Sequence, residues 1–209
     1  MASRISPTRP AHGKQARAER TRAMAIDETV RCVLEEGVGN ASAKHIAERA
    51  GVTWGVIQYH FGDRNGLLMA VVDQGQQELT TALAAVPAAT ATMTTRDRVE
   101  LAVTAAWEAM SSPTSRAAIE ILIATRANRD AAATAHLSQL GVAFAELCAL
   151  IDDKLSGPER AELGDLLLNN VRGLVTTQLI MSSNVDTVRS RKVLVEVISG
   201  YIDRQSTFH

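Results

Sequence analysis

Cysteine is scarce in this sequence. Its two cysteines, Cys32 and Cys148, lie far apart among apolar neighbours, without the short spacing of zinc ligands or of a redox pair. We therefore expect no metal site and no disulfide framework. Both thiols are typical of small core residues in a reducing cytoplasm.

Long apolar segments are also missing. No run of about 18 apolar residues is free of charge, so no membrane-spanning helix is expected, and the N-terminus lacks the apolar stretch of a signal peptide. Paired carboxylates, a Ser/His/Asp set and a glycine-rich phosphate loop do not occur, and His45, His60 and His136 are isolated. These absences predict a soluble cytoplasmic protein that is not an enzyme and uses no cofactor.

What the sequence does contain favours helices. Hydrophobic residues make up 46% of it and aromatic residues only 3%, and the apolar share consists mainly of Ala, Leu, Val and Ile. Ala and Leu are strong helix formers, and no segment alternates as a strand would. We expect an all-α fold.

Charge divides unevenly along the chain. Residues 1–64 hold ten basic against seven acidic residues, whereas residues 65–209 hold 12 against 16. A basic head on an acidic body indicates that one end meets a polyanion such as DNA, although an imbalance of this size also arises by chance.

Breaks in the pattern divide the chain into three parts. Residues 1–16 carry prolines and no apolar period, which predicts a disordered basic arm that either follows DNA phosphates or is an idle tail. Residues 17–64 are expected to form a compact group of short helices, and residues 65–209 a helical body. Apolar spacing and stop signals predict helices over about 18–36, 43–50, 54–59, 64–83, 97–110, 161–181 and 187–204, with one or two more between 114 and 155.

Two short predicted helices in the first part have the order of a helix-turn-helix. Ser42 can cap the first helix, Gly51 ends it, and Thr53 can cap the second. The small and branched residues that such a crossing needs on its inner faces are present. They are Ile46, Ala47, Ala50, Val52 and Ile57.

The outer face of the second helix carries side chains suited to a DNA major groove. Gln58 can pair with adenine, and Thr53 or Trp54 can touch a thymine methyl group. Lys44 and Arg64 are placed to reach phosphates from either side. Taken singly, the aromatic residues could equally be ordinary members of a helical bundle. The predicted DNA-binding residues are Ser42, Lys44, Thr53, Trp54, Gly55, Gln58, Tyr59, His60 and Arg64.

The segment from about Arg22 to Leu68 resembles the DNA-binding domain of the TetR (tetracycline repressor) family. The resemblance rests on Gly37, Ser42, Ile46-Ala47, Ala50-Gly51-Val52, Ile57, Tyr59-His60-Phe61, Arg64 and Leu67-Leu68. Two positions depart from the family pattern. Arg64 replaces the usual Lys and keeps its charge. Gln58 stands where a phosphate-binding Tyr is usual, and it either gives up a backbone anchor or reads a base.

The resemblance implies a three-helix helix-turn-helix DNA-binding domain over residues 17–64 and a C-terminal helical domain over residues 65–209 that binds an effector and dimerises. It implies a homodimer that binds operator double-stranded DNA and is released by a small molecule, as a repressor. An activator, a helical adaptor and an all-α enzyme are the alternatives.

Candidates for the dimer interface and the effector pocket follow from helical spacing in the second domain. Gly173 would permit close approach of a second chain, although a core face within one chain would explain half of the interface set. The predicted interface residues are Leu163, Leu167, Asn170, Leu174, Gln178, Leu194, Ile198 and Tyr201. The predicted effector-binding residues, each of which could also be simple core, are Trp107, Met110, Ile121, Arg126, His136, Phe144 and Cys148. Their aliphatic surroundings favour an apolar effector.

Overall fold

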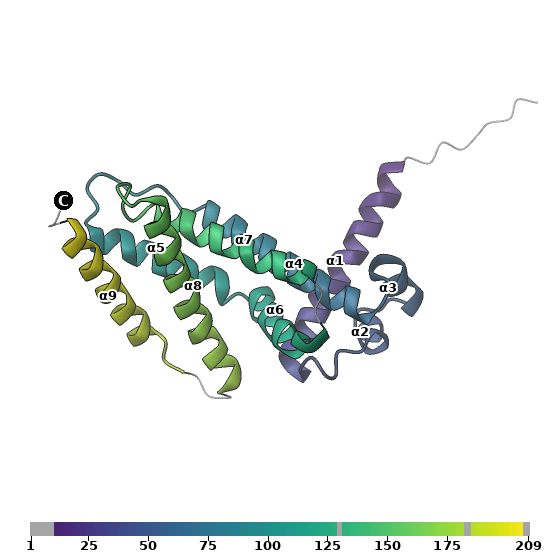
Figure 1. Ribbon diagram of the computed structural model, residues 1–209. Coiled ribbons are helices and arrows are strands. Elements are labelled where there is room, and N and C mark those ends of the chain that lie inside the picture. Colours follow the sequence, from purple (N-terminus) through teal and green to yellow (C-terminus); the bar gives the residue numbers. More distant parts are fainter. Residues whose placement is uncertain (1–10, 129–130, 182–184, 207–209) are drawn as a thin grey trace, which may run out of the picture. The chain divides into compact units, whose positions relative to one another are not determined.

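The computed structural model describes residues 11–128, 131–181 and 185–206, and within these ranges the chain is built from helices and contains no strand (Figure 1). The predicted all-α fold is confirmed. The chain divides into two compact units, unit 1 over Met1–Ala70 and unit 2 over Val71–His209. The helix α4 (Arg64–Ala84) runs through this division.

Unit 1 consists of α1 (Ala11–Glu36), α2 (Ala43–Arg49), α3 (Trp54–Phe61) and the first turns of α4. Because α1 begins at Ala11, the last six residues of the predicted arm are helical, and residues 1–10 lie outside the described part of the chain. The long helix α1 and the two short helices α2 and α3 all pack against one another. Their shared core includes Ile26, Val33, Ile46, Ile57, Leu67 and Leu68.

A charge network fastens α2 to α1. The Arg49 guanidinium donates to Glu28 at 2.5 Å, to Glu35 at 2.8 Å and to Glu36. His45 Nε2 lies 2.9 Å from the same Glu36 carboxylate, and these bonds, from His45 first and then Arg49, lower the pKa of Glu36. Glu28 is buried, and a buried carboxylate is costly unless it is paired. Arg49 and Arg31, the latter 3.0 Å away, compensate its negative charge.

Unit 2 continues with α5 (Thr95–Met110), α6 (Pro113–Ala124), the 3-10 turn η1 (Arg126–Asn128), α7 (Ala131–Cys148), α8 (Gly157–Ile180) and α9 (Val188–Ser206). The helix α7 packs along α8, and α5 packs against both α8 and α9. Capping boxes at Thr94/Asp97 and Ser156/Glu159 fix where α5 and α8 begin. No helix in the described ranges combines the length and the apolar character needed to cross a membrane.

A close helix contact in unit 2 involves Gly164. A Cβ atom at this position of α8 would lie 2.7 Å from Ala145 N and 2.9 Å from Phe144 C, both backbone atoms of α7. At Gly173, where the sequence predicts close approach of a second chain, a Cβ would lie within 4 Å of nothing in its own chain. The close backbone contact between α7 and α8 therefore depends on Gly164.

Each unit contains one buried cysteine. Cys32 lies in the core of unit 1 and Cys148 in the core of unit 2, and both are fully covered. Burial, followed by the nearby Glu36 charge, raises the pKa of the Cys32 thiol. Burial alone raises the pKa of Cys148 to about 12.

Candidate DNA-binding surface and ligand cavity

The geometry of α2 and α3 follows from three buried side chains and one glycine. Ile46 and Ala47 of α2 face Ile57 of α3 in the core. Gly51 turns the chain between the helices with a φ of 65°, a conformation that strains any residue with a Cβ. With one side of α3 fixed inward by Ile57, the opposite side must face outward.

The outward side of α3 holds the predicted base-reading residues. Tyr59 is 82% exposed and Trp54 is 44% exposed, and Thr53, Gly55 and Gln58 are also exposed. Thr53 stands at the N-cap position, yet its side chain makes no capping hydrogen bond. The structure thus presents a hydroxyl, an amide and two aromatic rings on one exposed helical face.

Three further predicted contacts lie around this face. His60 is half-buried, and its ring meets that of Tyr59 edge-on with centroids 5.0 Å apart. Ser42 caps α2 by accepting a hydrogen bond from His45 N. Lys44 is highly exposed and only loosely paired with Glu48, at 3.9 Å, so its ammonium group can reach a phosphate.

Arg64, a predicted phosphate contact, makes hydrogen bonds within unit 1. Its Nε donates to Ala41 O at 2.8 Å and its Nη2 donates to Val38 O at 2.5 Å. The side chain is half-buried. Arg64 therefore ties the start of α4 to the loop between α1 and α2, and two of its donors already have protein acceptors.

We expect Arg64→Gln to lower the free energy of unfolding of unit 1 by about 1–3 kcal/mol, because two loop carbonyls lose charged donors. Urea unfolding checks this. The salt dependence of DNA binding should change little. Lys44→Ala is the comparison: it should leave stability unchanged and reduce the salt slope by about 1, as loss of one phosphate contact does. If Arg64→Gln instead reduced the salt dependence of DNA binding and left the free energy of unfolding unchanged, Arg64 would be a phosphate contact.

Basic residues on α1 were missed as site candidates in the sequence. Arg17, Arg20 and Arg22 are exposed on the N-terminal half of this helix. Arg22 lies over the Phe61 ring at the end of α3, 5.4 Å from its centroid. The predicted helix from about residue 18 already contains Arg20 and Arg22, but no local pattern indicates that Arg22 lies against Phe61 of α3.

One group in unit 1 has the side chains of a metal site. The ligand atoms of Cys32, Glu36 and His45 lie within 4.8 Å of one another, and this is the one such group among the described residues. The Glu36 carboxylate already accepts from Arg49 and His45. Its charge is therefore balanced without an ion.

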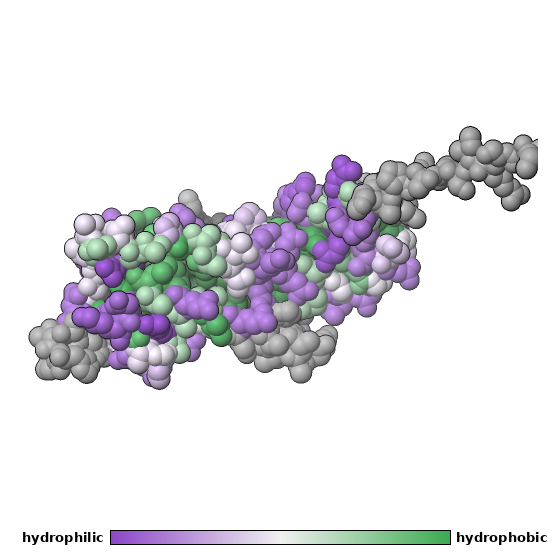
Figure 2. Space-filling model, turned by 90° about the horizontal axis from the view of Figure 1, so that it is seen from above, coloured by the Kyte–Doolittle hydropathy of each residue, from purple (hydrophilic) through white to green (hydrophobic). Residues whose placement is uncertain are grey.

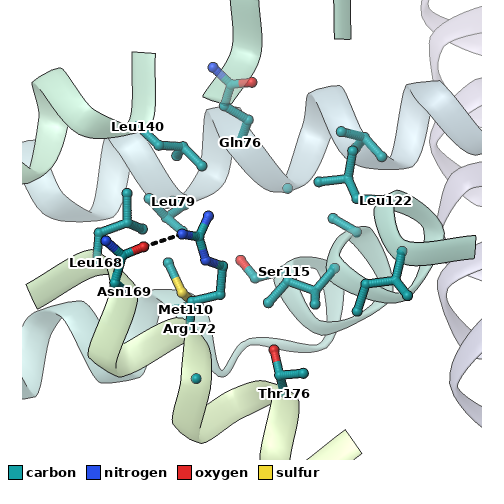
Figure 3. Close-up of a pocket in the computed structure, with 16 residues that line it drawn as sticks. Gln76, Leu79, Met110, Ser115, Leu122, Leu140, Leu168, Asn169, Arg172 and Thr176 are labelled. Atoms are coloured by element: carbon teal, nitrogen blue, oxygen red, sulfur yellow. Dashed lines mark hydrogen bonds between the residues drawn. The ribbon is translucent and has the colours of Figure 1, made fainter. Parts of the chain in front are cut away.

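Unit 2 contains a cavity of about 470 Å³, a size usual for small-molecule sites. Its walls come from α4, the end of α5, α6, α7 and α8 (Figure 3). Most of the lining is apolar. The lining residues are Val72, Gly75, Gln76, Leu79, Met110, Ser115, Ala118, Ile119, Leu122, Ile123, Leu140, Leu168, Asn169, Arg172, Gly173 and Thr176.

Of the predicted effector-binding residues whose side chains the structure describes, Met110 alone lines this cavity. Ile121, Phe144 and Cys148 are core residues without exposed surface. Trp107 packs against that core and is covered by the Arg191 guanidinium, 4.9 Å from a ring centroid. Arg126 is exposed and donates to Ile123 O. The side chain of His136 lies outside the described residues.

The predicted dimer residues divide between the two sides of α8 and α9. Leu163, Leu167, Leu194 and Ile198 belong to the core of their own unit and are not accessible to a second chain. Leu174 and Gln178 are half-buried, whereas Asn170 and Tyr201 are exposed. The helical period identified the right helices, but these four leucine and isoleucine side chains face inward.

A patch of apolar side chains reaches the surface of unit 2. Figure 2 shows green residues gathered on the part of the surface that unit 2 forms. Among the exposed large apolar residues, most lie on α8 and α9 or directly after α8. They are Leu166, Ile180, Met181, Val188, Val193, Val197 and Tyr201. Val193, Val197 and Tyr201 recur every four residues and so share one side of α9.

Comparison with known proteins identifies the N-terminal segment. Residues 25–71 match the family described as bacterial regulatory proteins, tetR family. The HTH-type transcriptional regulator BetI of Cronobacter sakazakii is 40% identical over 60 residues, which are 29% of this chain and 30% of that protein. BetI of Escherichia coli is 45% identical over 47 residues, 22% of this chain and 24% of that protein. The chain thus spans about a third or less of these curated relatives.

Solved structures share the fold over most of the chain. The multidrug binding protein EbrR, complexed with imidazole, is 21% identical with a TM-score of 0.59, covering 84% of this chain and 93% of its own. A transcriptional regulator from Rhodococcus sp. Rha1 is 18% identical with a TM-score of 0.65, covering 90% and 96%. NalD of Pseudomonas aeruginosa, described as the secondary repressor of a multidrug efflux pump, is 22% identical with a TM-score of 0.56, covering 87% and 94%. At these sequence identities the similarity shows a shared fold and nothing further.

Proposed function

We propose that this chain, whose residues 25–71 match the tetR family of bacterial regulatory proteins, binds a specific DNA operator and represses transcription until a small molecule occupies the cavity of unit 2. The observation that carries the proposal is the exposed side of α3. Thr53, Gln58 and Tyr59 present hydrogen-bonding groups there, and side chains of these kinds read base edges in the major groove.

DNA recognition of this kind needs two copies of α3. Helix-turn-helix dimers place their recognition helices about 34–36 Å apart, so that both enter successive major grooves on one side of the duplex. We propose that the protein is a homodimer and that its operator is a near-palindrome. A two-fold interface uses the same surface patch on both chains.

The apolar side of α9, together with Leu166 of α8, is our proposal for that interface. An apolar stripe of this kind on a soluble protein favours contact with another apolar surface. This interface replaces the inward-facing leucines of the sequence prediction with Val193, Val197 and Tyr201.

We expect Val197→Glu to weaken dimerisation at least tenfold, since a charge would be buried against an apolar partner surface. Val197 is 57% exposed in the single chain, so folding should be unaffected. Sedimentation over a range of concentrations measures the change. Val188→Glu is the matched control, because Val188 is 48% exposed and lies nine residues earlier, on the opposite side of the helix. If both variants dimerised equally well, this side of α9 would not be the interface.

The repressor function is tested by selecting duplexes from a random pool and measuring binding of the enriched sequence by gel shift. We expect enrichment of a near-palindrome whose specific affinity exceeds non-specific binding by about 10³-fold or more. Absence of any enriched sequence at physiological salt would contradict the proposal. Repeating the shift with candidate ligands tests release, for which a tenfold loss requires only about 1.4 kcal/mol of coupling.

A further inference from the structure

The cavity of unit 2 has an unusual balance of charge. Among its described lining residues, one side chain, Arg172, carries a full charge, and no Asp or Glu is present. The polar remainder consists of neutral hydroxyl and amide groups, of which the Ser115 hydroxyl already donates to Ala109 O at 2.9 Å. The site therefore combines an apolar wall with a single cation.

Arg172 has one protein partner, and that partner is neutral. Its Nη2 donates to Asn169 Oδ1, one helical turn earlier on α8, and no carboxylate of the described residues forms an ion pair with it. Figure 3 shows this pair side by side on the wall that α8 forms, with Leu168 and Met110 close to it in the same view. The guanidinium is half-buried, and most of its five donors have no acceptor among the described residues.

Three other arginines have carboxylate partners. Arg31 pairs with Glu28 and Arg49 reaches three carboxylates in unit 1, and Arg96 pairs with Glu196 on the surface of unit 2. Arginines that donate only to backbone carbonyls, such as Arg126, do not line this cavity. A cation that faces an apolar cavity without a counter-ion loses hydration and gains no Coulomb attraction in return. An anion that enters the cavity would supply both the charge and the acceptor atoms.

We infer that the cavity takes an amphipathic organic monoanion, with a carboxylate on Arg172 and an apolar body against Leu79, Met110 and Leu122. Guanidinium and carboxylate match as a planar two-bond pair, whereas a neutral or cationic head group leaves the guanidinium uncompensated. The inference refines the apolar effector expected from the sequence, and it rests on the proposed function only in treating this cavity as the effector site.

Three compounds with a ten-carbon chain and different head groups test the inference on the full-length protein. They are decanoate, decanol and decyltrimethylammonium, each titrated calorimetrically below its solubility limit and its micelle-forming concentration. We expect decanoate to bind at least tenfold more tightly than decanol, and decyltrimethylammonium to bind more weakly than both. Equal binding of decanoate and decanol, or preference for the cation, would overturn the inference.

Two variants locate the effect. Arg172→Gln should remove the preference for decanoate over decanol while decanol still binds, and Arg172→Lys should restore part of it. Arg126→Gln, which removes an exposed arginine outside the cavity, should keep the preference. Circular dichroism checks that each variant is folded. A preference that survives in Arg172→Gln would overturn the assignment.

The DNA assay separates this inference from the proposed function. If decanoate binds through Arg172 but does not release DNA, the ligand class stands and the release mechanism is wrong. If the protein binds its selected duplex but shows no preference for decanoate over decanol, the DNA-binding function stands and the ligand class is wrong.

Discussion

The Gly164→Ala variant is expected to lower the free energy of unfolding of unit 2 by about 2–3 kcal/mol, because one added methyl group overpacks a tight contact. The new Cβ would lie 2.7 Å from Ala145 N and 2.9 Å from Phe144 C. These are backbone atoms within α7, so no side chain can rotate to make room. Relief requires α7 and α8 to separate, and that loosens the core around Phe144.

Gly173→Ala is the matched control for this prediction. It is the same substitution on the same helix, at a position where the Cβ would meet nothing within 4 Å. Because Ala is favoured over Gly within helices by about 1 kcal/mol, this variant should be as stable as the wild type or slightly more stable. Urea unfolding monitored by circular dichroism compares the two. Equal stabilities would mean that α7 and α8 do not approach closely at Gly164.

The double variant Gln58→Ala/Tyr59→Ala is expected to bind the selected operator roughly 10–100-fold more weakly, in line with the worth of base contacts in the major groove. Both side chains are exposed on α3, so their removal should not change the stability of unit 1. Gel shift measures affinity for the operator and for unrelated duplexes. Non-specific affinity should fall far less, since no cation is removed.

The single variant Gln58→Ala decides between the two roles that the sequence left open for this residue. Loss of preference at one base position would identify Gln58 as a base reader. Unchanged preference with uniformly weaker binding would identify a backbone contact. Gln77→Ala, which removes an exposed glutamine from the part of α4 in unit 2, is the control and should bind the operator as the wild type does.

Much of unit 1 could be predicted because its signals are local. Gly51 has the positive φ that its place after α2 predicts, and Ile46, Ala47 and Ile57 are buried as the helix-turn-helix pattern requires. The loop contacts of Arg64 could not be predicted, for a non-local reason. The carbonyls that it binds belong to residues 23 and 26 positions earlier, and no sequence period reports which carbonyls a folded loop exposes.

The cavity could not be predicted from the sequence, because its walls come from several helices far apart along the chain. Helical spacing shows which side of a helix is apolar, but it does not show whether that side meets another side chain or an open space. Phe144 and Met110 follow similar patterns and both belong to the core, yet Met110 also lines the cavity and Phe144 does not. The same ambiguity placed Leu167 and Ile198 at an interface, although they belong to the core.

The distribution of the two thiols allows local opening to be followed separately in each half of the protein. Cys32 and Cys148 are fully covered and belong to different units, and a thiol must be both accessible and deprotonated before it reacts with an alkylating reagent. Alkylation of Cys32 therefore reports exposure of the DNA-binding half, and alkylation of Cys148 that of the cavity-bearing half. Mass spectrometry of the two peptides yields both opening rates from one sample of unmodified chain, without an introduced label.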